Sequence, residues 1–99
     1  MLDVVEKIGQ WAHDRNLIEG SDAKTQLLKT MEELGELAKA VGKNDKPQII
    51  DGIGDVIVTL VIVALQCGTS VPEATAAAYE EIKDRKGRLV NGLFQKEAA

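Results

Sequence analysis

Five carboxylates between positions 32 and 55 are the groups in this sequence best suited to chemistry: Glu32, Glu33, Glu36, Asp51 and Asp55. Helical residues are spaced about 100° apart, so Glu32 and Glu36 lie about 40° apart and Glu33 and Glu36 about 60° apart. Asp51 and Asp55 are also four residues apart and share one helix face. Oxygen ligands from two facing helices predict a site for a hard divalent cation such as Mg²⁺, whose waters phosphate oxygens can displace.

Each acid also has an ordinary interpretation. Glu32 and Glu33 could form a solvated helix face, and Glu36 could pair with a nearby lysine. Asp51 could be a first-turn acid that complements the helix dipole. Asp55 differs, because the sequence after it is almost wholly apolar. We expect Asp55 to be a buried carboxylate, which needs a partner or a cation.

Helices that would position these acids are predicted from apolar residues at helical spacing and from Gly and Pro at the breaks. Ser21, Asp45 and Ser70 are the expected N-caps of the second, third and fourth helices. The predicted helices cover residues 2–15, 22–41, 46–67 and 71 to 85 or 89, and residues 91–99 are predicted to be a tail.

The stretch from Val56 to Val63 has the composition of a buried strand. No other segment resembles a partner strand, and a single strand cannot satisfy its own backbone hydrogen bonds. We therefore expect a central helix that is apolar nearly all round and is covered largely by another copy of the chain. The predicted architecture is an all-α bundle of about four helices in one domain, residues 1–99.

Composition excludes several classes of function. The 99 residues carry a formal net charge of −4, which argues against nucleic acid as the main partner. Cys67 is the single cysteine, so neither an intramolecular disulfide nor a multi-thiolate zinc site is possible. No signal peptide is visible, and the longest apolar stretch is about half the length of the ~20 residues a membrane span needs. We expect a cytoplasmic protein without a membrane partner.

Residues 32–36 (EELGE), a short spacer, residues 51–55 (DGIGD) and a long apolar helix resemble the MazG-like all-α nucleoside triphosphate pyrophosphohydrolases. The pattern of that family is EExxE, a short spacer and ExxD. Residues 85–88 (RKGR) and 92–96 (GLFQK) are similar to the small MazG-like proteins of phages and mobile elements.

The resemblance implies hydrolysis of a nucleoside or deoxynucleoside triphosphate to the monophosphate and pyrophosphate, as in house-cleaning of the nucleotide pool. It also implies Mg²⁺ as cofactor, with Mn²⁺ able to replace it, and packing as a homodimer or homotetramer. Carried over by position, Glu33, Glu36 and Asp55 are the metal-binding acids. Glu32 matches the first acid of EExxE, and we assign it as the catalytic base.

One position departs from the family pattern. The first acid of ExxD falls on Gly52, which has no side chain. Asp51 is the expected stand-in as a metal ligand, although in a helix it points about 100° away from position 52. Gly52 and Gly54 are expected to let the other acidic helix or a ligand approach closely, because a glycine inside a helix otherwise costs about 1 kcal/mol relative to Ala.

The candidate substrate-binding residues are Lys83, Arg85 and Lys86, at the end of the fourth helix, and Trp11 in the first. The basic residues could bind phosphates, or could form a solvated helix end favoured by the dipole. Trp11 could stack on a base, but its helical spacing with other apolar residues favours core packing.

Two other classes of function stay open. One is a non-enzymatic helical module that binds a nucleotide, a metal or a partner protein, and Gly52 is the residue that favours it. The other is a purely structural oligomerising bundle.

Overall fold

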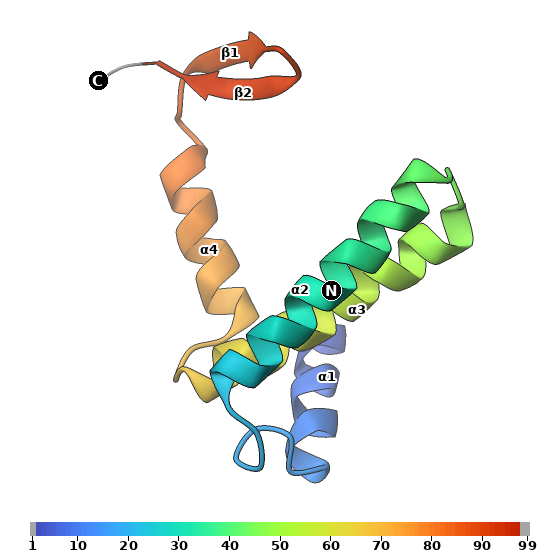
Figure 1. Cartoon of the computed structure of the whole chain (residues 1–99). Helices are drawn as coiled ribbons and strands as arrows, with labels where there is room; N and C mark the ends of the chain where they lie inside the picture. Colours follow the sequence, from blue (N-terminus) through green and yellow to red (C-terminus); the bar gives the residue numbers. More distant parts are fainter. Residues whose placement is uncertain (1, 98–99) are drawn as a thin grey trace.

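The computed structural model describes residues 2–97. Within them the elements are α1 (Leu2–Asp14), α2 (Ala23–Gly42), α3 (Lys46–Gln66), α4 (Val71–Ile82) and a hairpin of β1 (Gly87–Val90) and β2 (Leu93–Lys96). A short turn folds α3 back antiparallel on α2, α1 packs on α3, and α4 leads away to the hairpin (Figure 1). The all-α fold is confirmed, with a two-stranded sheet added.

Short polar side chains begin three of these helices. Asp45 and Ser70 cap α3 and α4 as predicted, each accepting a 3.2 Å hydrogen bond from the backbone N–H three residues later. The cap of α2 is Asp22 rather than the predicted Ser21, and its carboxylate accepts the backbone N–H of Thr25 at 2.8 Å. This bond and one from the Thr25 hydroxyl hold the pKa of Asp22 below its ordinary value.

The contact between α2 and α3 is closest at Gly52. A Cβ placed on Gly52 would lie 3.1–3.3 Å from atoms of Leu37, including its backbone Cα. A Cβ placed on Gly54 would meet no atom within 4 Å in the described part of the chain. The expectation of a close helix approach is therefore confirmed for Gly52, while Gly54 faces open space. The stretch from Val56 to Val63 lies in α3 and is helical, as predicted.

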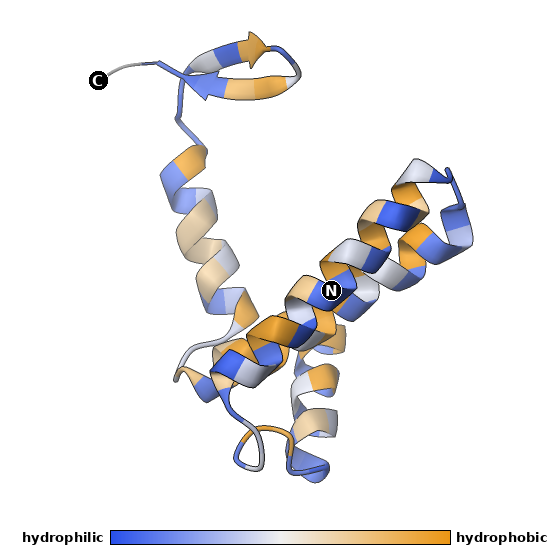
Figure 2. Cartoon of the chain, in the orientation of Figure 1, coloured by the Kyte–Doolittle hydropathy of each residue, from blue (hydrophilic) through white to orange (hydrophobic). Residues whose placement is uncertain are grey.

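Much apolar surface of α3 and α2 stays exposed in the single chain. Only 28% of the most apolar 18-residue window of α3 is buried. By length and composition alone α3 could cross a membrane, and the core helix of a water-soluble bundle passes the same test. Apolar residues recur along the visible length of both helices (Figure 2). The expected burial of Asp55 is wrong for the single chain, where the residue is exposed, because it borders an open pocket between α3 and α2.

The end of the chain differs from the sequence prediction. Helix α4 ends at Ile82, before the expected 85 or 89, and β2 lies within the expected tail of residues 91–99. Residues 98 and 99 are outside the described residues. The strands pair in antiparallel register, with Leu89 opposite Phe94. Asn91 (φ 51°) and Gly92 (φ 81°) form the turn, and positive φ at both central positions is the pattern of a type I′ hairpin.

We predict opposite consequences for alanine at the two helix glycines. Gly54→Ala should raise the free energy of unfolding by about 1 kcal/mol, because Ala is the better helix former and has room. Gly52→Ala should be at least about 1 kcal/mol less stable than Gly54→Ala, because its Cβ pushes the two helices apart. Urea unfolding followed by circular dichroism measures both. Equal gains in the two variants would contradict the close contact at Gly52.

Candidate functional site

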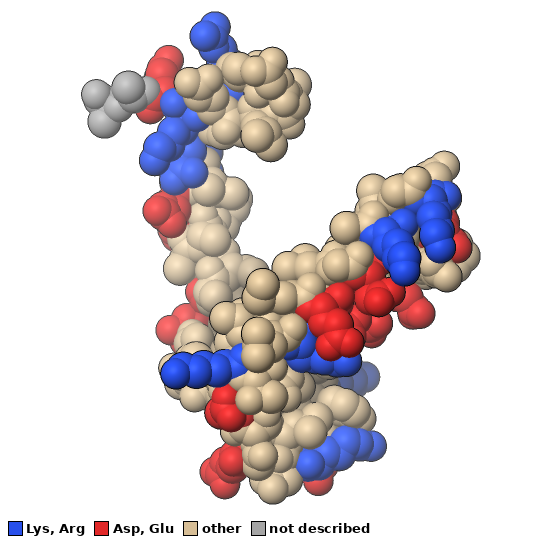
Figure 3. Space-filling view, viewed as in Figure 1, with Lys and Arg blue, Asp and Glu red and all other residues tan. Residues whose placement is uncertain are grey.

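A pocket of about 240 Å³ opens between α2 and α3. Its lining residues are Glu33, Glu36, Ala40, Gln48, Asp51, Gly52 and Asp55. Four of the five acids that the sequence singled out thus border one space, from two helices. Within residues 2–97 no Lys or Arg lines this pocket. Figure 3 shows acidic side chains gathered over the middle of α2 and α3.

The helical repeat explains why these residues meet. On α2 the lining positions are 33, 36 and 40, and on α3 they include 48, 51 and 55. Each series follows the i, i+3, i+7 spacing of one helix face. The turn at 43–45 makes the two helices antiparallel, so the two faces oppose each other. Gln48 was not among the predicted site residues, although its spacing from Asp51 and Asp55 places it on the same face.

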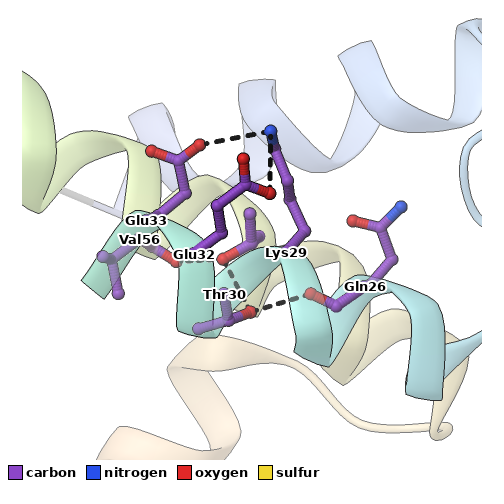
Figure 4. A network of polar contacts seen from close by, with 7 residues as sticks. Gln26, Lys29, Thr30, Glu32, Glu33 and Val56 are labelled. Atoms are coloured by element: carbon purple, nitrogen blue, oxygen red, sulfur yellow. Dashed lines mark hydrogen bonds and ion pairs between the residues drawn. The ribbon is translucent and has the colours of Figure 1, made fainter. Parts of the chain in front are cut away.

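Lys29 lies beside the first two acids (Figure 4). Its Nζ is 3.5 Å from a carboxylate oxygen of Glu33 and 3.7 Å from one of Glu32. The side chain of Glu33 is 17% exposed, whereas that of Glu32 is 66% exposed. Glu32 is not among the lining residues, so it lies next to the pocket rather than in it. Lys29 was not among the predicted site residues, although its i, i+3 and i, i+4 spacing to the two acids indicates the contact.

A buried pair of threonines joins α2 to α3 one turn from the acids (Figure 4). The hydroxyl of Thr30 donates to that of Thr59 at 2.8 Å, and Thr59 donates to the carbonyl of Val56 at 2.7 Å. The hydroxyl oxygen of Thr30 also lies 3.0 Å from the carbonyl oxygen of Gln26. Both threonines are buried, and sliding one helix along the other would break the hydrogen bond between them and leave each hydroxyl only the carbonyl of its own helix. The pair therefore fixes the register in which the two acidic faces meet.

The donor set of the pocket is chemically suited to a hard divalent cation. Four carboxylates and one amide supply only oxygen ligands of the kind that Mg²⁺ prefers. As the side chains are placed, however, no three Asp, Glu, His or Cys residues in the described ranges converge closely enough to hold an ion. Asp51 and Gly52 both line the pocket. Asp51 therefore supplies a carboxylate next to position 52, where the pattern ExxD has its first acid.

The basic candidates do not reach this pocket in the single chain. Lys83 pairs with Glu80 at 2.6 Å and Arg85 with Glu81 at 3.9 Å, on and just after α4. Lys86 follows them ahead of β1. For the elements that the structure describes, no Cα of α4 lies within 8 Å of a Cα of α2. None of the three lines the pocket, and Figure 3 shows basic side chains at the end of α4 apart from the acids on α2 and α3.

Trp11 is neither in the core nor in the acidic pocket. It is 42% exposed, so the expected core packing is wrong for the single chain. The guanidinium of Arg15, one helical turn later, lies 4.7 Å from the centre of the indole ring, which is cation–π distance.

Comparison with known proteins decides the family. Residues 21–89 match the model of the MazG nucleotide pyrophosphohydrolase domain. This chain belongs to the MazG family. The MazG match contains all five acids, Lys29 and α4, and it ends within β1, while α1 and β2 lie outside it.

A phage protein is similar over much of the same length. Over 66 residues the chain is 49% identical to an uncharacterized 18.2 kDa protein from the rep–hol intergenic region of Haemophilus phage HP1, strain HP1c1. That match covers 67% of this chain and 40% of the phage protein. No solved structure matches the chain.

The threonine pair gives a second prediction. Thr30→Val and Thr59→Val should each lower the free energy of unfolding by about 0.5–1.5 kcal/mol. The double variant should cost about 1 kcal/mol less than the sum, because both substitutions remove the same hydrogen bond. Denaturant unfolding measures the cycle. Thr75→Val is the control, because that hydroxyl bonds only carbonyls of its own helix. Additive costs for Thr30→Val and Thr59→Val would contradict the coupling.

Proposed function

We propose that this protein is a Mg²⁺-dependent pyrophosphohydrolase that converts a nucleoside or deoxynucleoside triphosphate to the monophosphate and pyrophosphate. The observation that carries the proposal is the pocket between α2 and α3, where four carboxylates of a MazG family member meet. A role in house-cleaning of the cytoplasmic nucleotide pool follows from this activity.

The residues proposed to hold the metal are Glu33, Glu36, Asp51 and Asp55, and Gln48 supplies a neutral oxygen at the same face. Bound there, a divalent ion lowers the pKa of a water and neutralises phosphate charge, and Mn²⁺ can replace Mg²⁺ in this role. Asp51 takes the place of the acid that Gly52 lacks. Because Glu33 is paired with Lys29, binding of the ion would compete with that ion pair.

The reaction forms a bond from a water oxygen to the α-phosphorus and breaks the bond from that phosphorus to the oxygen bridging to the β-phosphorus. Pyrophosphate leaves, and the proton of the water goes to a carboxylate. Glu32 is the proposed acceptor, because it lies beside Glu33 but outside the pocket lining, where it stays free of metal. Lys29 lies within 4 Å of both acids and balances their charge until the ion binds.

Assembly as a homodimer or homotetramer is part of the same proposal. The exposed apolar side chains of α2 and α3 need cover that one chain does not supply. They include Leu27, Leu28, Met31, Leu34, Ile50, Ile53 and Leu60. We expect light scattering on the purified protein to give the mass of a dimer or a tetramer. A stable folded monomer at micromolar concentration would contradict this part of the proposal.

A non-enzymatic nucleotide- or metal-binding module is the second candidate. Two observations favour it, the glycine at the first position of ExxD and the acids that do not converge among the described residues. Such a module would be stabilised by Mg²⁺ with a nucleotide without turning it over.

Pyrophosphate release tests the two candidates. A screen of the eight common nucleotides with Mg²⁺ should release pyrophosphate from at least one. Glu36→Gln and Asp55→Asn should each lower kcat by about a hundredfold or more, because each removes a charge that offsets the bound cation. Glu73→Gln, an exposed acid of α4, is the matched control and should keep full activity.

The outcomes separate cleanly. Full activity in Glu36→Gln and Asp55→Asn would overturn the site assignment. No release from any nucleotide, together with a Tm raised by Mg²⁺ and a non-hydrolysable nucleotide, would establish the non-enzymatic module instead.

A further inference from the structure

The C-terminal hairpin is left without a partner by the rest of the chain. Among the described elements, no Cα of β1 or β2 lies within 8 Å of a Cα of any helix. Leu89, Leu93 and Phe94 are 75%, 74% and 57% exposed. A lone two-stranded hairpin is only marginally stable in water, so this one needs a surface to pack on.

The charge of this region is opposite to that of the rest of the molecule. Five of the twelve Lys and Arg residues fall within positions 83–96, with Asp84 the single acid there. This segment therefore carries +4, and the remainder of the chain carries −8. Figure 3 shows basic side chains around the end of α4 and the hairpin, well apart from the acids on α2 and α3. The two regions are complementary in charge, but one chain does not bring them together.

The acidic pocket lacks what a triphosphate needs besides a metal. No Lys or Arg of the described residues lines it, and Lys29 is already shared by Glu32 and Glu33. The lysines near the α2–α3 turn do not line the pocket either. Exposed apolar side chains such as Ile53 lie on the same two helices but outside the lining. The acidic pocket and the exposed apolar surface of α2 and α3 together suit a partner that carries cations and apolar side chains.

One face of the hairpin has that composition. Because cross-strand partners share a face, Arg88 and Gln95 lie on the same face as Val90 and Leu93. The opposite face holds Leu89, Phe94 and Lys96, and the ring of Phe94 already lies against Gly87. Arg88 has no ion pair among residues 2–97. Its planar guanidinium can bind two phosphate oxygens at once, which the point charge of Lys cannot.

We propose that the hairpin of one copy packs on α2 and α3 of a second copy and brings Arg88 to the mouth of that copy's acidic pocket, where it binds the triphosphate. The role of Arg88 rests on the proposed function. Leu93 and Val90 cover apolar surface beside the pocket, and the guanidinium supplies the missing cation. In a two-fold dimer each hairpin serves the other chain, so both sites are completed by the same contact.

Mixed dimers test the proposal through activity. Arg88→Ala should lower kcat/KM at least tenfold, roughly the loss of one charge-assisted hydrogen bond, and Arg88→Lys should restore part of it. Arg15→Ala is the matched control and should leave kcat/KM unchanged. A purified heterodimer of one Arg88→Ala chain and one Asp55→Asn chain should recover about half of the wild-type activity, because one site then has both its acids and its arginine.

Two outcomes would overturn the proposal. A heterodimer no more active than its parents would show that each site uses the arginine of its own chain. Wild-type kcat/KM in Arg88→Ala would show that the hairpin does not serve the site.

A disulfide trap tests the contact without reference to activity. In a Cys67→Ser background, a chain with Gln95→Cys is mixed with a differently tagged chain with Ile53→Cys and oxidised mildly. A disulfide between the two chains is expected, and Lys7→Cys on α1 in place of Ile53→Cys should give none. If the wild type releases no pyrophosphate, the proposed function fails, and this disulfide still decides the packing. Absence of the disulfide between chains would overturn the packing. So would a disulfide that forms only inside one chain when both cysteines are placed in the same chain.

Discussion

The close antiparallel packing of α2 on α3 is the contact on which the rest of this structure depends. Gly52 lets the backbone of α3 approach Leu37, and the Thr30–Thr59 hydrogen bond fixes the register one turn away. With that register, acids spaced for one helix face on each side border a single pocket. A one-turn slip would move every carboxylate of one helix by about 5.4 Å relative to the other.

The same packing leaves much of the apolar surface of the single chain exposed. Helix α3 must carry two acids and also supply most of the apolar surface of a small domain, and one partner helix cannot cover all of it. Exposed apolar side chains on α2 and α3, an unpartnered hairpin and separated charges of opposite sign are all explained if copies of the chain pack together. Assembly would then also complete the site, because the exposed apolar surface and the acidic pocket belong to the same two helices, α2 and α3.

Local signals in the sequence predicted the helices and the acidic faces well. Caps such as Asp45 and Ser70 act within one turn, and the helical repeat placed the acids without knowledge of the tertiary fold. The hairpin was missed although Asn91-Gly92 between apolar pairs is its local signal, because the helical pattern of α4 was extended too far. The burial of Asp55 was wrong for a different reason: an apolar run predicts burial, but not which chain supplies the cover. Helical spacing cannot predict that the pocket lining, among the residues that the structure describes, lacks Lys and Arg, because the residues that reach the pocket depend on the tertiary arrangement of the helices.

The central claim is that the carboxylates of α2 and α3 form a divalent metal site. A crystal soaked in Mn²⁺ with a non-hydrolysable nucleotide and measured at the manganese edge tests it most directly. We predict an anomalous peak between the two helices, from an ion bonded to Asp55 and to at least two of Glu33, Glu36 and Asp51. An occupied nucleotide with no peak in this pocket, or a peak bound by other residues, would contradict it.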